Sequence, residues 1–192
     1  GSRCAAKFAR LKGIAPSKMA FETLAGIIRA EVRNKTVRVQ LTGATGLRLD
    51  MDVPLAGGIR TGHFINTGVP HLVYFSDHLE AEDVLAVGNA SRRHDIFKPA
   101  GTNVNFVQVE GSHRLRIRTY ERGVEGETLA CGTGAVAAAL IAAALGKAVS
   151  PVTVLTKGGD RLIVSFTRTG ETFADLHLEG AVGVVCEGYL YI

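Results

Sequence analysis

The sequence predicts an α+β fold of two half-similar units, in each of which antiparallel strands surround one hydrophobic helix. Most of the chain consists of short runs in which apolar and polar residues alternate, a pattern typical of strands with one wet face. Residues 1–13 and 135–145 have instead the composition of helices. The second of these is apolar on every side, as expected of a helix enclosed by a sheet.

Length and composition limit the class of protein. With 192 residues, 46% of them hydrophobic, the chain can bury the core of one or two domains. The longest apolar stretch, residues 135–145, is far shorter than the ~20 residues that cross a bilayer, and no signal peptide is visible. Three cysteines without a CxxC pair argue against a disulfide scaffold and a Cys-rich zinc site. We therefore expect a cytoplasmic protein without a membrane span.

The basic charge does not indicate nucleic-acid binding. The formal net charge is +4 and the pI is about 9.1, but the lysines and arginines are spread along the chain. Aromatic residues make up only 6% of the sequence, too few for a base-stacking platform. A mildly basic surface is the simpler interpretation, and it suits an anionic small-molecule substrate.

The first unit begins with a helix over residues 1–13, which Gly13 and the following Pro16 end. Strands follow in the alternating runs AFETLAG, IIRAEVRN, TVRVQL and LRLDMDV. Residues 54–58, PLAGG, are the most linker-like stretch of the chain. We therefore predict one domain over 1–56, a second over 57–182, and a final strand over 183–192 whose return to the first domain stays open.

The second unit combines further strands with one amphipathic helix. Residues 79–94 are expected to form that helix, with Val84 and Leu85 facing inward. Gly158–Asp160 is a strong hairpin signal. The remaining strands are expected in the runs GHFIN, HLVYFSD, NVNFVQVE and HRLRIRTY and over residues 152–156, 161–167, 173–178 and 182–192.

Cys131 is the strongest candidate for a catalytic residue. It directly precedes Gly132-Thr133-Gly134, with which the apolar helix begins. The first turn of a helix has unpaired N–H groups and a partial positive charge, and glycines let an anion approach those donors. Such a position lowers the pKa of a thiol. Cys131 is thus a candidate nucleophile or proton-transfer base. The alternative is a small buried hydrophobe, the common fate of a free cysteine.

The segment ERGVEGETLACGTGA, residues 121–135, resembles the second cysteine motif of the diaminopimelate epimerases. The resemblance implies two pseudo-symmetric domains facing a cleft and a cofactor-independent enzyme. Such enzymes use two cysteines to interconvert LL- and meso-diaminopimelate, precursors of lysine and peptidoglycan. No metal-ligand set or pyridoxal lysine motif is visible. A racemase of another amino acid and a non-catalytic ligand-binding homologue remain alternatives. Whether the protein forms a homodimer is left open.

The N-terminal residues Gly1-Ser2-Arg3-Cys4 match the last four positions of the family's first cysteine motif, Cys-Gly-Asn-Gly-x-Arg-Cys. The match implies that Gly1 and Ser2 contact substrate and that the first catalytic cysteine falls three residues before Gly1. Cys4 is then one helical turn too deep to replace it. We expect Cys4 to be a packing residue, Cys186 a core residue of the last strand, and residues 1–192 alone to be inactive. The alternative is that Gly1-Ser2 is a remnant of cloning and not part of the motif.

The resemblance also assigns other site residues. It implies that His71 and Glu121 tune the two thiols, and that Asn103 and Arg122 read the distal end of the substrate. Val69 stands where some members carry a substrate-contacting Asn. From the residues alone, His71 could equally be a satisfied core residue, Asn103 a loop cap, and Glu121-Arg122 solvent-facing. The residues implied to bind the substrate carboxylate are Gly132, Thr133 and Gly134.

Overall fold

The computed structural model describes residues 1–24 and 26–188. Its α+β architecture confirms the predicted fold class. The three α-helices of the described residues are α1 (Ser2–Leu11), α2 (Val84–Arg92) and α3 (Gly132–Ala144), and two 3₁₀ helices, η1 (Leu79–Ala81) and η2 (Asp95–Phe97), flank α2. No helix in residues 1–24 and 26–188 is long and apolar enough to cross a membrane.

The strands form one continuous sheet in the order β1-β2-β3-β12-β11-β10-β8-β7-β6-β5-β4, with β9 paired to β8. Their bounds are β1 (Lys18–Thr23), β2 (Gly26–Arg33), β3 (Thr36–Gln40), β4 (Thr45–Leu55), β5 (Gly58–Asn66), β6 (Pro70–Phe75), β7 (Asn103–Gly111), β8 (Arg114–Glu121), β9 (Gly126–Thr128), β10 (Val152–Leu155), β11 (Arg161–Thr169) and β12 (Thr172–Ala181).

The sheet is mixed, whereas the sequence predicts antiparallel strands throughout. Strand β6 pairs with β7 in parallel, and β8 pairs with β10 in parallel. A helix lies in each of these two connections, α2 between β6 and β7 and α3 between β8 and β10. A helical crossover returns the chain in its original direction, so the two strands it joins run parallel. Alternation within a strand carries no information about this direction.

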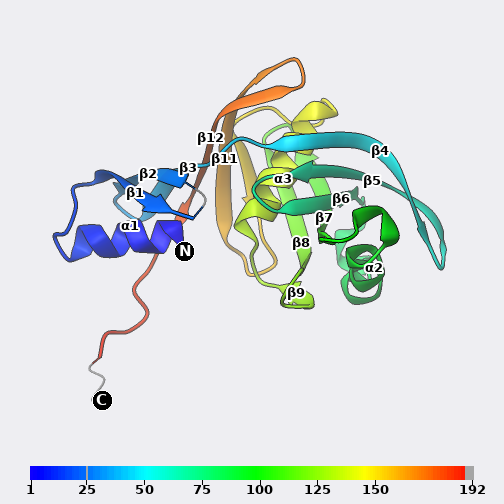
Figure 1. Ribbon diagram of the computed structural model, residues 1–192, viewed down its shortest axis with the longest axis horizontal. Helices are drawn as coiled ribbons and strands as arrows, with labels where there is room; N and C mark the ends of the chain where they lie inside the picture. Colours follow the sequence, from blue (N-terminus) through cyan, green and yellow to red (C-terminus); the bar gives the residue numbers. More distant parts are fainter. Residues whose placement is uncertain (25, 189–192) are drawn as a thin grey trace.

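Helix α3 is the centre of the larger unit, and strands surround it (Figure 1). Residues 135–142 are fully buried, and they contact β5, β6, β7, β8, β10, β11 and β12. The many alanines let strands approach the helix axis closely on every side. The predicted helix over 135–145 is therefore confirmed, together with its enclosure.

Helix α2 is shorter than predicted. Asp83 ends the preceding irregular segment, and its carboxylate accepts a hydrogen bond of 2.9 Å from the Ala86 N–H. This cap starts the helix at Val84 and leaves residues 79–81 as a separate 3₁₀ turn. Val84 faces the core as predicted, but Leu85 is 59% exposed, because successive residues of a helix point about 100° apart and Val84 takes the buried direction.

The smaller unit consists of α1 packed on β2 and β3, and Figure 1 shows it beside the larger unit. Strand β12 pairs with β3 on one side and β11 on the other, and so joins the units. Residues 54–58 are not a linker, because Pro54 and Leu55 pair with Ile59 and Gly58 in the β4–β5 hairpin. The domain boundary at residue 57 stays a prediction, although the residues that suggested it, 54–58, form the turn of this hairpin.

Two cysteine predictions and one strand prediction are wrong. Cys4 is exposed, because Ala6 is the residue that α1 buries. Cys186 is also exposed, since β12 ends at Ala181 and residues 182–188 form no strand. This tail stays near the first unit, where Val182 N–H donates to Lys35 O and Lys12 pairs with Glu187. The rest of the expected last strand, residues 189–192, lies outside the described residues.

Candidate active site

Cys131 is the N-cap of α3, as the sequence predicts. Its backbone is extended, with φ −125° and ψ 110°, and its carbonyl accepts the first helical hydrogen bond, 3.0 Å from the Ala135 N–H. The side chain is 6% exposed. Its Sγ lies 3.6 Å from the Thr133 hydroxyl, within the first turn. The thiol therefore stands at the mouth of the buried helix.

The pKa of the Cys131 thiol is raised above its ordinary value of 9.0, and burial is the main cause. Hydrogen bonds from the Thr133 hydroxyl and from the Gly134 and Thr133 N–H groups lower it, but by less. The negative charge of Glu121 adds to the increase. The lowering predicted from the helix end is therefore wrong: the donors are present, yet desolvation of the thiolate outweighs them.

Alkylation should reveal this raised pKa, because only the thiolate reacts. With iodoacetamide, Cys131 is expected to react slowly at pH 7 and faster as the pH rises past 9, whereas the exposed Cys4 and Cys186 are labelled first. Peptide mass spectrometry after timed labelling at several pH values measures the three rates. Cys131 labelled at pH 7 as fast as Cys4 would contradict the prediction.

His71 lies on β6 and is fully buried. Burial lowers its pKa to about 3, and the positive charge of Arg122 acts in the same direction. The ring is therefore neutral. Its Nδ1 lies 3.2 Å from Asn105 Nδ2, and its Nε2 is buried with no hydrogen-bond partner in residues 1–24 and 26–188.

Asn103 and Arg122, the two residues that the resemblance implies to read the distal end of the substrate, are joined by a hydrogen bond. Asn103 Oδ1 accepts a hydrogen bond of 2.9 Å from the Arg122 N–H, and Asn103 Nδ2 donates to Pro70 O at 3.0 Å. Arg122 Nη1 donates to Ala100 O at 2.9 Å. His71 and Asn103 are register partners in the parallel β6–β7 pair. Val69 lies in the turn just before β6.

Asn105 is a residue that the sequence reasoning missed. It follows Asn103 by two positions on β7, so both side chains lie on the same face of the strand. Its amide contacts His71, and a methyl group added to Gly134 would overlap its Oδ1 and lie 3.2 Å from Cys131 Sγ. The Asn-x-Asn spacing in a strand beside the histidine strand was the available signal.

An ion pair holds the segment that leads to Cys131. Arg118 on β8 makes two hydrogen bonds, of 2.7 and 2.8 Å, with the carboxylate of Glu127 on β9. Arg118 Nη1 also donates to the carbonyls of Leu79 and Glu82, at 3.1 and 3.2 Å. The two charged side chains are only 12% and 19% exposed. This pair fixes the approach to the helix mouth against η1.

Glu127→Gln is expected to destabilise the fold at neutral pH by roughly 1.5–3 kcal/mol. Arg118 holds the pKa of Glu127 below its ordinary 4.5, so the stabilisation is complete above that value and is lost as the pH falls through the folded-state pKa. Urea unfolding at pH 7 and pH 3 measures the difference, which should shrink at pH 3. Glu31→Gln, at an exposed pair with Arg33, is the control. A difference independent of pH would refute the prediction.

The two helix ends lie on the same face of β12. A methyl group at Gly180 would overlap the Arg3 guanidinium in the first turn of α1, and one at Gly132 would lie 3.1 Å from Leu178 Cδ2. Leu178 and Gly180 are two residues apart, so they share a face. In Figure 1 the N-terminus of α1 lies beside β12. Arg3 of α1 and Gly132 of α3 thus approach β12 at positions two residues apart.

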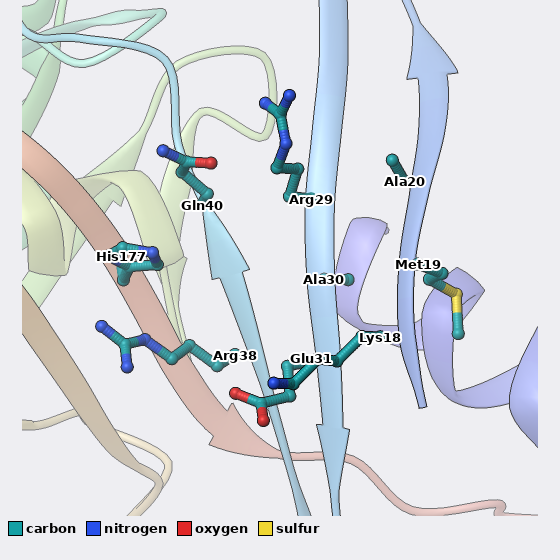
Figure 2. Close-up of a pocket in the computed structure, with 9 residues that line it drawn as sticks. All are labelled: Lys18, Met19, Ala20, Arg29, Ala30, Glu31, Arg38, Gln40 and His177. Atoms are coloured by element: carbon teal, nitrogen blue, oxygen red, sulfur yellow. The ribbon is translucent and has the colours of Figure 1, made fainter. Parts of the chain in front are cut away.

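A cavity of about 610 Å³ lies elsewhere, on the opposite face of β1, β2, β3 and β12 from α1. Figure 2 shows Arg29, Arg38, Gln40 and His177 on neighbouring strands around it. None of the site residues predicted from the sequence lines this open groove. Among residues 1–24 and 26–188, no group of three His, Cys, Asp or Glu side chains could hold a metal ion.

Comparisons with known proteins show which family the sequence resembles. A family model described as diaminopimelate epimerase matches residues 63–175. A diaminopimelate epimerase of Hydrogenobaculum sp. is 46% identical over 194 residues, covering 99% of this chain and 68% of the relative. One of Aquifex aeolicus is 46% identical over 193 residues, with the same two coverages.

Similar solved structures are more distant in sequence. A probable proline racemase from Agrobacterium radiobacter has a TM-score of 0.71 and 17% identity, over 94% of this chain and 63% of its own. A hydroxyproline epimerase from Agrobacterium vitis has a TM-score of 0.68 and 18% identity, over 94% and 62%. At these identities the likeness shows the fold alone.

Proposed function

Because the chain belongs to the diaminopimelate epimerase family, we propose that it interconverts LL- and meso-diaminopimelate, with Cys131 acting on one face of the substrate's α-carbon. The observation that carries the proposal is the buried thiol at the N-cap of α3, beside the N–H groups of Gly132, Thr133 and Gly134. These donors suit a carboxylate next to the carbon that changes configuration.

Inversion requires that a base remove the α-proton from one face and that an acid return a proton to the other. As thiolate, Cys131 takes the proton and becomes a thiol, while an opposed thiol protonates the planar carbanion and becomes a thiolate. The raised pKa of Cys131 means that its resting state is the thiol, the proton-donating form. In the reverse reaction the two groups exchange roles. The pKa values then belong to the pair.

The other site residues support this chemistry. The negative charge of Glu121 raises the pKa of Cys131 and so favours its protonated form. Asn103 and Arg122, joined by a hydrogen bond, would bind the distal amino-carboxylate group, and an arginine suits a carboxylate because its donors form a planar fork. Gly1 and Ser2, at the N-terminus of α1, would contact the substrate from the smaller unit.

The test is an assay with LL-diaminopimelate in deuterated water, which follows α-deuterium incorporation and the meso isomer. Both residues 1–192 and the product of the full reading frame should be assayed, because the motif match at Gly1–Cys4 implies an opposed cysteine before Gly1. Conversion by the full product supports the proposal, and its absence in every preparation contradicts it. Proline and hydroxyproline serve as competing substrates, since proteins named for them share the fold.

We also propose a cytoplasmic location and a small-molecule ligand rather than nucleic acid. The free state of Cys4, Cys131 and Cys186 fits a reducing compartment. A homodimer is a further proposal, which sedimentation would test.

A further inference from the structure

Asn105 lies between His71 and the first turn of α3, and all its polar atoms are used. The side chain is fully buried. Its Nδ2 lies 3.0 Å from Leu72 O and 3.2 Å from His71 Nδ1, and its Oδ1 accepts a hydrogen bond of 3.0 Å from the Thr119 hydroxyl. Such a fully satisfied amide has a single orientation.

That orientation determines which ring nitrogen of His71 carries the proton. A backbone carbonyl only accepts, so the group facing Leu72 O is the Asn105 NH₂. Its second hydrogen then points at His71 Nδ1, which must offer a lone pair. A neutral imidazole has one N–H, and here it is on Nε2.

We propose that Asn105 is a positioning residue that sets the tautomer of His71, so that His71 presents a buried Nε2–H donor instead of a basic lone pair. The proposal rests on the function proposed above, in which His71 acts at the Cys131 site. Nε2 has no partner in the described part of the chain. Its acceptor is an oxygen of the substrate carboxylate, on which negative charge grows as the α-proton leaves.

Asn105 also ties the histidine to the thiol. Its Oδ1 lies against Gly134, where a methyl group would overlap it and would also lie 3.2 Å from Cys131 Sγ. The backbone of Gly134 is thus in contact with the residue that orients His71, one turn from the thiol. A single amide sets both the direction of the donor and its distance from the helix mouth.

The test is ¹⁵N NMR of the histidine rings, which distinguishes a protonated from a bare nitrogen without measuring turnover. His63 is an internal reference, because it too is buried and its Nδ1 accepts a hydrogen bond of 3.1 Å from the Asp50 N–H, independently of Asn105. The His71 signals are assigned by their loss in His71→Gln. In the wild-type protein, His71 is expected to carry its proton on Nε2.

Asn105→Asp replaces the donor facing Nδ1 by a carboxylate oxygen. The His71 proton should then move to Nδ1, or both nitrogens should be protonated, while His63 is unchanged. Thr119→Val removes only the contact to Oδ1 and should leave the His71 tautomer as it is. A wild-type His71 protonated on Nδ1 would overturn the proposal even if Asn105→Asp did not fold. An Asn105→Asp protein that folds and retains Nε2–H would also overturn it.

Because no step of this test depends on catalysis, its failure is distinct from failure of the proposed function. If the tautomer is as expected but diaminopimelate is not epimerised, the positioning role of Asn105 stands and the substrate assignment falls.

Discussion

Cys131→Ser is expected to lower turnover of diaminopimelate by about 10²–10⁴-fold, the contribution of a positioned acid or base. A serine hydroxyl keeps the size and location of the thiol but is far less acidic, so it neither donates nor accepts the α-proton readily. The measurement is α-deuterium incorporation by the product of the full reading frame. Binding should change little, because the N–H groups of residues 132–134 remain.

The matched control is the double variant Cys4→Ser with Cys186→Ser, which removes the two exposed thiols and leaves the helix mouth intact. It should retain most of the activity. Turnover by Cys131→Ser close to that of the wild type would show that the proton passes through another group. Loss of activity in the double variant with Cys131 present would point to the same conclusion.

Gly134→Ala is expected to abolish most of the activity and to destabilise the fold by about 1–3 kcal/mol, the usual cost of overpacking. The added methyl group overlaps Asn105 Oδ1 and lies 3.2 Å from Cys131 Sγ, so either the amide or the thiol must move. Alanine is otherwise the better helix former. A helix-propensity argument alone would therefore predict the opposite sign for stability.

Gly57→Ala is the control for this substitution, because a methyl group at position 57 meets no atom within 4 Å. It should leave activity and stability nearly unchanged. Urea unfolding and the deuterium assay are run on both variants in parallel. A Gly134→Ala protein as stable and as active as the wild type would mean that the turn relaxes without moving Asn105.

The elements that depend on local pattern could be predicted from the sequence. The strands other than β9 follow the alternation, and α3 follows an apolar run that starts after Gly-Thr-Gly. The short β9 (Gly126–Thr128) lies in the motif before Cys131, where no alternation marks a strand. What could not be predicted depends on distant parts of the chain. The parallel pairs come from where a crossover returns, and the raised pKa of Cys131 comes from strands that exclude water around it.

The candidate site likewise contains residues that the sequence indicates and residues that only the folded structure reveals. Cys131 is recognisable because its own neighbours define the helix mouth, and the resemblance indicates His71, Asn103 and Arg122. Asn105 escaped notice because its role exists only where β6, β7 and β8 meet α3. The exposure of Cys186 likewise follows from the end of β12 at Ala181, which no pattern in the sequence marks.

Strand β12 sets the spacing between the N-terminal ends of α1 and α3. Leu178 lies under Gly132 and Gly180 under Arg3, so the repeat of one strand, about 6.8 Å for two residues, sets their spacing. A slip of one residue in the pairing of β12 would turn both positions to the opposite face. Such a slip would therefore disturb both helix mouths together, although each belongs to a different unit, whereas an insertion or deletion of one residue between 178 and 180 would turn only one of the two positions away.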